Sequence, residues 1–349
     1  MRLTSAILLL SAVSLGLGSC SDDDNDYVPT PPESEAVGFT VAVPRAPRTS
    51  RAVTTTGNIE EFRTWAFYNG ANYMSNVTVK RSGDEWTYSP LMYWPADGSL
   101  NFYCISPMID NTTQLAPVET HIPDYINTAG TTDLLYAVTK GATAGTTGKV
   151  KINFRHALSQ VQVNLKRKEA SSTQAAIRVD VKEVGFTAIC QQGSFMFPNA
   201  TTDSKTDVTG TWSDVVSPVS PKVYVGFDQL EDKYVNFNST GYMFAIPQTL
   251  QESVDAGNSS YEGSYIRVLC SIYDEKSGVK IWPSASTPAE DMTDGDAYIY
   301  FPIASAELPL ATKEWKAGKS YVYNITVGVP QGSSIIDFDV TVDDYNDFE

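Results

Sequence analysis

The residue best placed to undergo a defined reaction is Cys20, because it ends a segment typical of exported proteins. Arg2 supplies a charged start, and residues 6–13 (AILLLSAV) supply an apolar run of signal-peptide length. Small residues stand directly before the cysteine in LGSC (residues 17–20), as in a bacterial lipobox, where the cysteine sulfur takes a diacylglycerol. The alternative is an ordinary secretory signal with an unrelated cysteine. We predict a signal peptide over residues 1–19 and lipidation of Cys20.

Few other residues have types and spacings suited to catalysis or metal binding. The two histidines, His121 and His156, lie far apart in the sequence, so a two-histidine metal site or a histidine-dependent triad is disfavoured. The acidic loop at residues 290–296 could supply oxygens to Ca²⁺, but it lacks the spacing of a familiar calcium loop, so a solvated turn is the default. The chain has neither a G-x-S-x-G elbow nor a phosphate-binding loop. We predict no catalytic residue, metal, cofactor or enzymatic activity.

The remaining cysteines are expected to be structural residues rather than reactive ones. Lipidation of Cys20 leaves Cys104, Cys190 and Cys270, which cannot all pair, and no C-x-x-C spacing suggests zinc or redox chemistry. Cys104 and Cys270 stand in strand-like contexts, where a thiol usually acts as a small buried apolar group.

Charge and composition restrict the possible partners. The formal net charge is -16, which repels nucleic acid and leaves no polybasic patch for anionic lipid. Residues 20–35 begin with an acidic run and continue with Pro29, Pro31 and Pro32, so they predict an extended tether between the lipid and a folded body.

The body reads as β structure almost throughout. Short runs rich in Val, Ile, Tyr, Phe and Thr alternate with polar residues and are separated by Gly, Pro, Asn and Ser. These runs are residues 37–43, 64–68, 77–80, 100–105, 150–156, 266–273 and 297–301. The small-residue loop at 141–148 suggests a boundary, which gives domains at 36–148 and 149–349, although length alone also allows one large β domain. A change of apolar phase at Ala157 and Leu158 predicts a bulge or bend.

An aromatic cluster at residues 86–94 allows two interpretations. Trp86, Tyr88, Tyr93 and Trp94 could form an exposed platform on which sugars stack, or they could pack inside a hairpin core, which is the commoner use of such alternation.

Several segments together identify a family resemblance. In order they are Trp94-Pro95, DLLYA at 133–137, FRHALSQV at 154–161, AIPQ at 245–248 and WKAGKSYVY at 315–323. With the lipobox, this succession resembles the fimbrillin (FimA/Mfa-like) lipoproteins of Bacteroidales, from about residue 20 to the C-terminus. The resemblance implies two tandem transthyretin-like Greek-key β-sandwiches and a structural or adhesive subunit of type V pili. The acidic run after Cys20 also resembles the surface-export signal of Bacteroidales lipoproteins, which implies an outer-membrane lipoprotein on the cell surface.

The resemblance also implies a route of assembly. In fimbrillins an arginine-specific protease removes the first strand, and the C-terminal strand of another subunit fills the groove by donor-strand exchange. Here the first strand would bury Val37, Phe39, Val41 and Val43, and the donor strand would present Ile336, Phe338, Val340 and Val342. The loop between the first strand and the body offers three cleavage sites, in order of preference Arg51, Arg48 and Arg45.

Two other roles stay open. The chain could be a pilus anchor that keeps its lipid and remains uncut, with the C-terminal strand closing its own domain. It could also be a surface lipoprotein that binds glycans and does not polymerise. The expected partners are other fimbrillin subunits, the outer membrane through Cys20 before cleavage, and ligands on host or bacterial surfaces; nucleic acid is not among them.

Overall fold

The computed structural model describes residues 35–44, 54–107, 120–145, 148–203, 208–255, 261–306, 308–309, 313–330 and 338–344. Within these ranges every named element is a β-strand except one short 3-10 helix, Ala289–Asp291. The all-β prediction is therefore confirmed. No helix in the described part of the chain is long and apolar enough to cross a membrane.

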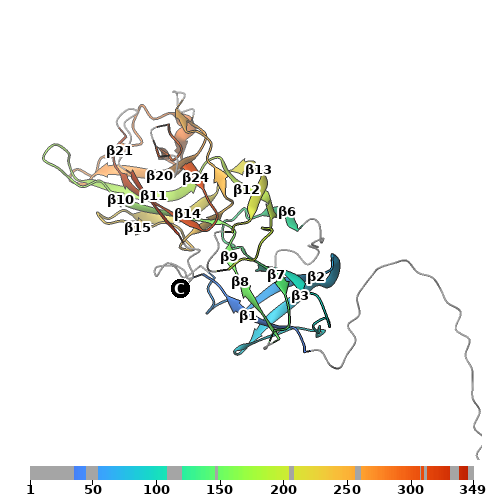
Figure 1. Cartoon of the computed structure of the whole chain (residues 1–349). Helices are drawn as coiled ribbons and strands as arrows, with labels where there is room; N and C mark the ends of the chain where they lie inside the picture. Colours follow the sequence, from blue (N-terminus) through green and yellow to red (C-terminus); the bar gives the residue numbers. More distant parts are fainter. Residues whose placement is uncertain are drawn as a thin grey trace, which may run out of the picture.

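The first group of strands builds one six-stranded sheet and a two-stranded partner (Figure 1). The sheet runs in the order β4 (Glu85–Thr87), β3 (Ala71–Ser82), β2 (Glu61–Tyr68), β5 (Leu100–Ser106), β7 (Leu135–Ala142) and β9 (Arg155–His156). Its partner is a parallel pair, β1 (Gly38–Ala42) and β8 (Lys149–Asn153). A first core of buried side chains, including Phe39, Phe62, Phe102 and Phe154, belongs to these strands.

A second group of strands forms a five-stranded and a six-stranded sheet at the other end of the molecule (Figure 1). One has β15 (Val235–Asn236), β10 (Ser159–Arg167), β25 (Lys319–Val327) and β26 (Phe338–Asp344) in order, with β16 (Met243–Ala245) also on β10. The other has β14 (Lys222–Gln229), β11 (Ile177–Phe186), β20 (Tyr265–Asp274), β23 (Asp296–Pro302) and β22 (Met292–Thr293), with β21 (Lys280–Trp282) on β20. Inward side chains of both sheets share a second core.

Three small sheets complete the described elements. They are β6 (His121–Ile126), β12 (Ile189–Met196) and β13 (Thr211–Val219); β17 (Gln248–Thr249) with β24 (Glu314–Trp315); and β18 (Val254–Asp255) with β19 (Tyr261–Glu262). The turn before β25 contains Gly318, whose φ of 70° is in the region that glycine adopts without strain. Its amide donates to the carbonyl of Leu158, 2.9 Å away, so the turn also joins the start of β10.

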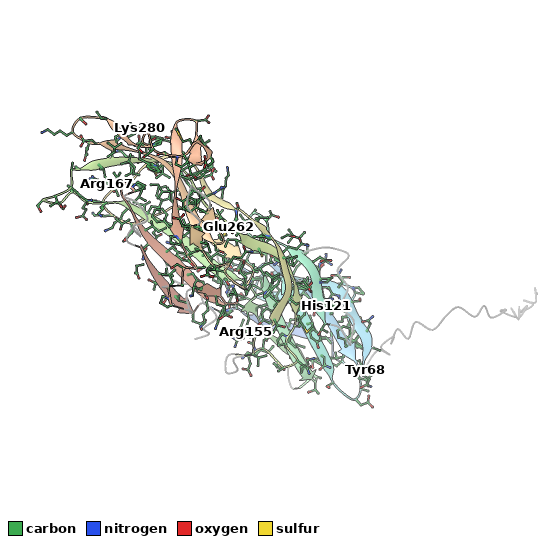
Figure 2. All side chains as sticks on the ribbon, turned by 90° about the horizontal axis from the view of Figure 1, so that it is seen from above. Tyr68, His121, Arg155, Arg167, Glu262 and Lys280 are labelled. Carbon is green, nitrogen blue, oxygen red and sulfur yellow. The ribbon has the colours of Figure 1, made fainter. Side chains whose placement is uncertain are left out.

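A third core links the two groups of strands. Side chains alternate between the two faces of β5, so Phe102 and Cys104 enter the first core while Tyr103 and Ile105 enter the third. There they meet residues from later in the chain, including Phe195 on β12. Figure 2 shows an elongated molecule with Tyr68 near one end, Lys280 near the other and His121 between them.

Strand pairing shows that the chain passes from the first group of strands to the second after residue 148. β8 pairs with β1 and β9 pairs with β7, so both still belong with the first group. β10 is the first strand bonded to β25. The change therefore falls at Ala157 and Leu158, where the sequence shifts its apolar phase. Residues 141 and 142 belong to β7, and the next strand in the sequence is β8. A division into tandem domains remains a proposal, and on this pairing its boundary would lie between β9 and β10.

Packing in the second core predicts that substituting two different phenylalanines will have very different effects on stability. Phe186 is fully buried, with its ring edge-on to Trp315 at 5.8 Å, whereas Phe227 on β14 is 61% exposed with Lys182 over its ring. We expect Phe186→Ala to lower the free energy of unfolding by about 3–5 kcal/mol, because it removes a packed ring and leaves a cavity. The matched control Phe227→Ala should cost less than about 1 kcal/mol. Urea denaturation measures both, and equal losses would contradict this packing.

Candidate functional site: the first strand and its groove

The candidate site is the place that β1 occupies in the first core. β1 runs parallel to β8, with Phe39 opposite Val150, Thr40 opposite Lys151 and Val41 opposite Ile152. Val37, Phe39 and Val43 are 1%, 2% and 6% exposed, and Val41 packs half-buried against the same core. The alternate residue Thr40 is exposed. One face of the strand therefore completes the core while the other meets solvent.

Phe39 lies in a cage of three aromatic rings. Its ring centroid is 5.6 Å from Phe62, 5.6 Å from Tyr88 and 5.9 Å from Phe102, each in an edge-to-face arrangement. Such contacts add to the free energy gained by burying the ring. We call the surface formed by this cage and the inward side chains of β8, Val150 and Ile152, the β1 groove. Removal of β1 would expose it to water.

Main-chain hydrogen bonds hold β1 on both sides. The amide of Gly38 donates to Gly148 and the amide of Phe154 donates to Ala42, at 2.9 and 2.8 Å. On the other side the amide of Val37 donates to Met92 at 2.8 Å, and the Tyr88 hydroxyl donates to the Val37 carbonyl at 2.8 Å. The groove thus offers donors and acceptors to a backbone as well as apolar pockets to side chains, which is what a strand-binding site requires.

Both ends of the predicted cleavage loop are anchored in the body. At the entry, Val43 exchanges two hydrogen bonds with the Thr56 hydroxyl, at 2.8 and 3.1 Å. At the exit, the amide of Thr54 donates to Asp133 at 2.8 Å, and the same carboxylate pairs with buried His156 at 2.8 Å. The cleavage candidates Arg45, Arg48 and Arg51 lie outside the described residues. His156 is a fully buried core residue with a polar partner.

The predicted donor strand is the edge of its own sheet. β26 runs antiparallel to β25, with Val340 opposite Tyr323 and Val342 opposite Tyr321, and it has no second neighbour among the described strands. Val340 is half-buried against the second core, while Val342 is 37% exposed. Ile336 and the side chain of Phe338 lie outside the described residues. The strand is therefore paired in this state, but its apolar face is incompletely covered.

The aromatic cluster at 86–94 lies inside the sandwich. Trp94 is 4% exposed and its indole N–H donates to the Gly148 carbonyl at 3.0 Å. Trp86 and Tyr88 pack half-buried against the first core, with Trp86 5.3 Å from the Phe62 ring. The interpretation as an exposed sugar-stacking platform is wrong, because these rings are used to cover the core beside β1.

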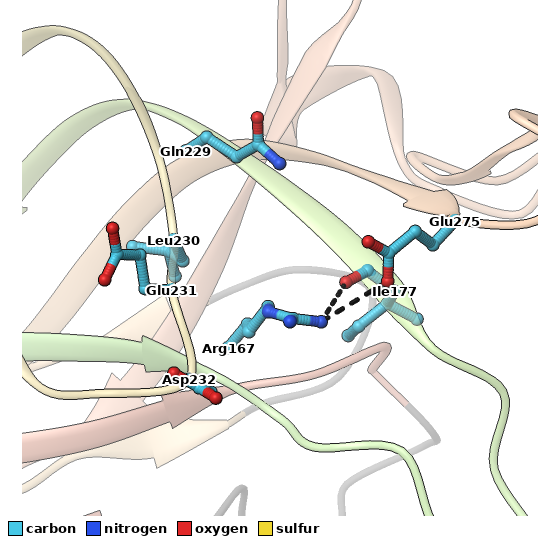
Figure 3. A pocket seen from close by; sticks show the side chains of 7 residues that line it. All are labelled: Arg167, Ile177, Gln229, Leu230, Glu231, Asp232 and Glu275. Atoms are coloured by element: carbon cyan, nitrogen blue, oxygen red, sulfur yellow. Dashed lines mark hydrogen bonds and ion pairs between the residues drawn. The ribbon is translucent and has the colours of Figure 1, made fainter.

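Two hollows lie outside the groove. In the first, of about 340 Å³, Arg167 lies among Glu231, Asp232 and Glu275 and donates to Glu275 at 3.5 Å (Figure 3). The second, of about 570 Å³, is lined by Tyr103 and Lys140, whose ammonium donates to the Tyr103 hydroxyl. The second hollow also contains Ser213, whose hydroxyl donates to the carboxylate of the exposed Asp214 at 3.1 Å.

No group of three or more His, Cys, Asp or Glu side chains in the described residues could hold a metal ion. In the acidic loop, Asp291 is buried, and the Asp296 carboxylate accepts a hydrogen bond from Ser271. The loop's carboxylates are therefore not gathered around a common point.

The chain belongs to the Fimbrillin-like family, whose sequence profile matches residues 49–344. Its structure is similar to a fimbrial protein from Bacteroides vulgatus ATCC 8482, with a TM-score of 0.53 and 14% identity over 89% of this chain and 99% of that one. It is also similar to a fimbrilin (fimA) from Porphyromonas gingivalis W83, with a TM-score of 0.50 and 13% identity over 90% and 98%. At these identities the likeness concerns the fold. A search of curated proteins gave no match.

The three described cysteines are buried and unpaired, as predicted for Cys104 and Cys270. Burial raises the pKa of the Cys104 thiol to about 12, against a small opposing effect of its hydrogen bond to Thr64. Burial also raises the pKa values of Cys190 and Cys270. A raised pKa keeps each thiol protonated at neutral pH, and only the thiolate reacts.

We therefore expect these thiols to resist labelling in the folded protein. At pH 8 the thiolate fraction of Cys104 should be about a thousandfold below that of an unperturbed thiol. A disulfide reagent added to a chain beginning at Ser21 should react within its usual time only after unfolding in urea. The exposed variant Ser220→Cys gives the rate for an accessible thiol. Rapid labelling of a native cysteine in the folded chain would contradict its burial.

Proposed function

We propose that this chain is a lipoprotein precursor of a cell-surface pilus subunit, assembled by removal of β1 and insertion of a partner's C-terminal strand. Its place in the Fimbrillin-like family supports a fimbrial or adhesive role. The proposal assigns the protein no enzymatic activity. It places the precursor on the outer membrane through Cys20 and the assembled form in a cell-surface fimbria.

The observation that carries the proposal is a repeated side-chain pattern. The first strand reads Val37-x-Phe39-x-Val41-x-Val43, and the C-terminal strand reads Ile336-x-Phe338-x-Val340-x-Val342. The two patterns have a β-branched residue, a phenylalanine and two valines in the same order. A strand with the second pattern offers the β1 groove the side chains that it already accommodates.

Once β1 has been removed, burial favours the transfer of β26 from its own sheet into the empty groove. Val342 is 37% exposed at the edge of its own sheet, whereas Val43, at the equivalent place in the pattern, is 6% exposed. Covering one valine to this extent contributes on the order of 1 kcal/mol. The main-chain hydrogen bonds that β26 loses on leaving β25 can be replaced by bonds to the donors and acceptors of the groove. The free energy of main-chain hydrogen bonding therefore changes little.

The assembly prediction uses the two faces of β26. Mature protein treated with an arginine-specific protease should gain a new N-terminus after Arg51, Arg48 or Arg45 and form ladders that resist mild denaturant. Val340→Asp should prevent ladders, because it brings a carboxylate into an apolar pocket. Thr341→Asp is the matched control on the exposed face and should leave them intact.

Thermal unfolding of both variants separates an assembly defect from misfolding. A wild-type chain that is cut in the loop and remains a stable monomer would refute donor-strand exchange. Normal ladders from a folded Val340→Asp variant would exclude β26 as the donor.

Lipidation is tested independently of assembly. In a bacterial host that processes lipoproteins, a fatty-acid probe should label the wild-type chain, because the thiol of Cys20 is the predicted acceptor. Cys20→Ala should lose the label, whereas Cys190→Ala, which removes a buried thiol, should keep it. Persistent labelling of Cys20→Ala would place the lipid elsewhere.

An anchor subunit is the second candidate. The pairing of β26 with its own β25 and the anchoring of both ends of the arginine loop favour a chain that stays intact and keeps its lipid. Resistance of the loop to the arginine-specific protease would favour this role.

A further inference from the structure

The exposed face of β8 carries two lysines beside an uncharged strand. In the β1–β8 register, Lys149 lies opposite Gly38 and Lys151 lies opposite Thr40. Lys149 pairs with Glu85 at 2.8 Å. Lys151 is exposed and forms no ion pair among the residues that the structure describes. β1 therefore satisfies the apolar side of the groove but leaves the positive charge of Lys151 unmatched.

The C-terminal strand combines the apolar pattern of β1 with acidic residues on the other face. Its sequence is Asp337-Phe338-Asp339-Val340-Thr341-Val342, and that of the first strand is Gly38-Phe39-Thr40-Val41-Ala42-Val43. When both are read in the same direction with the phenylalanines superposed, Asp337 falls opposite Lys149 and Asp339 opposite Lys151.

We infer that the C-terminal strand of a second copy of this chain enters the β1 groove parallel to β8, with Phe338 in the place of Phe39. Asp339 then lies beside Lys151, in the next strand at the usual spacing of about 4.8 Å. This inference rests on the proposed strand exchange and adds its partner, direction and register.

Other parallel registers fit less well. A shift by one residue turns the apolar face toward solvent. A shift by two in either direction puts Val340 or Ile336 into the aromatic cage instead of Phe338, and leaves one aspartate opposite a lysine where the inferred register has two. The aromatic cage and the two lysines therefore select the same alignment.

The charges are better matched in the groove than in the donor's own sheet. There Asp339 lies opposite the neutral Asn324 and forms no ion pair with any described residue. Beside β8 it would meet Lys151, whose charge is unmatched by β1. Cross-strand pairs of opposite charge are favourable, and the exposed face keeps the solvation cost small.

The two aspartates do not contribute equally. A Cβ added at Gly38 would lie 2.9 Å from Cγ of Lys149, so this flexible side chain must move to admit Asp337. Lys149 also has Glu85 as a partner already. The pair of Asp339 with Lys151 is therefore the main electrostatic contact of the inferred register.

Lys151 and its complement Asp339 lie on the same chain, so the charge match points to another copy as the partner. Each subunit would give its C-terminal strand to one neighbour and receive a strand from another. Such a head-to-tail contact produces an open filament when its rotation does not close a ring. The inference thus assigns the chain to a homopolymeric stalk.

The experiment reverses the charges one at a time and together. After cleavage at low salt, Lys151→Glu and Asp339→Lys should each slow ladder growth by about threefold to tenfold, and the double variant should recover it. Lys280→Glu is the control, because it makes the same charge change at the far end of the molecule (Figure 2). If the single reversals grow at the wild-type rate, or the double variant shows no recovery, the charge pairing is wrong.

Engineered disulfides distinguish the direction of the strand. Parallel entry places Thr341 beside Asn153, so Thr341→Cys combined with Asn153→Cys should cross-link neighbouring subunits. Antiparallel entry over the same seven positions would instead place Thr341 beside Lys149, and Thr341→Cys with Lys149→Cys would trap it. Wild-type ladders with only the second cross-link would overturn the inferred direction. Wild-type protein that is cleaved yet forms no ladders would instead refute strand exchange itself.

Discussion

The packing of Phe39 between Phe62, Tyr88 and Phe102 is the interaction on which the first core depends. Protein interiors are close-packed, so a ring removed from such a position leaves a cavity that its neighbours fill only in part. β1 brings this ring, and it is held by one parallel strand and by the 88–94 segment. The first sandwich is therefore complete only while some strand occupies the groove.

The rest of the architecture makes the groove rigid. β5 and the first half of β7 are buried on both faces, because their outer sides enter the third core shared with β12. Phe102, one wall of the groove, lies on β5 between Tyr103 and the neighbouring residues of that strand, so its backbone is also fixed by the third core. A preformed apolar site with free backbone groups favours capture of a replacement strand.

The sequence was sufficient for the β class, for the alternating faces of 37–43 and for the family, because each depends on local periodicity or on motifs in order. It did not reveal that β1 pairs with β8 in parallel, since periodicity is the same for parallel and antiparallel neighbours. The loop at 141–148 suggested a boundary because small residues look alike in a linker and in a turn. The sequence did not decide whether Trp86 and Trp94 are buried or exposed, because alternation does not show which face of a strand meets solvent. Thr56 and Asp133, which anchor the arginine loop, carry no local signal.

In the proposed assembly, the covalent link between β1 and the body would keep an intact chain from polymerising spontaneously. A strand tethered by a short loop competes for its groove at an effective concentration on the order of millimolar, far above that of a second copy in dilute solution. The intramolecular strand therefore wins even if the incoming strand has the better charge match at Lys151. The proposed cut in the loop would remove this advantage at once, because β1 would then be a separate ligand that stays with Cys20. In this scheme proteolysis changes no contact in the groove; it changes which strand can return to it.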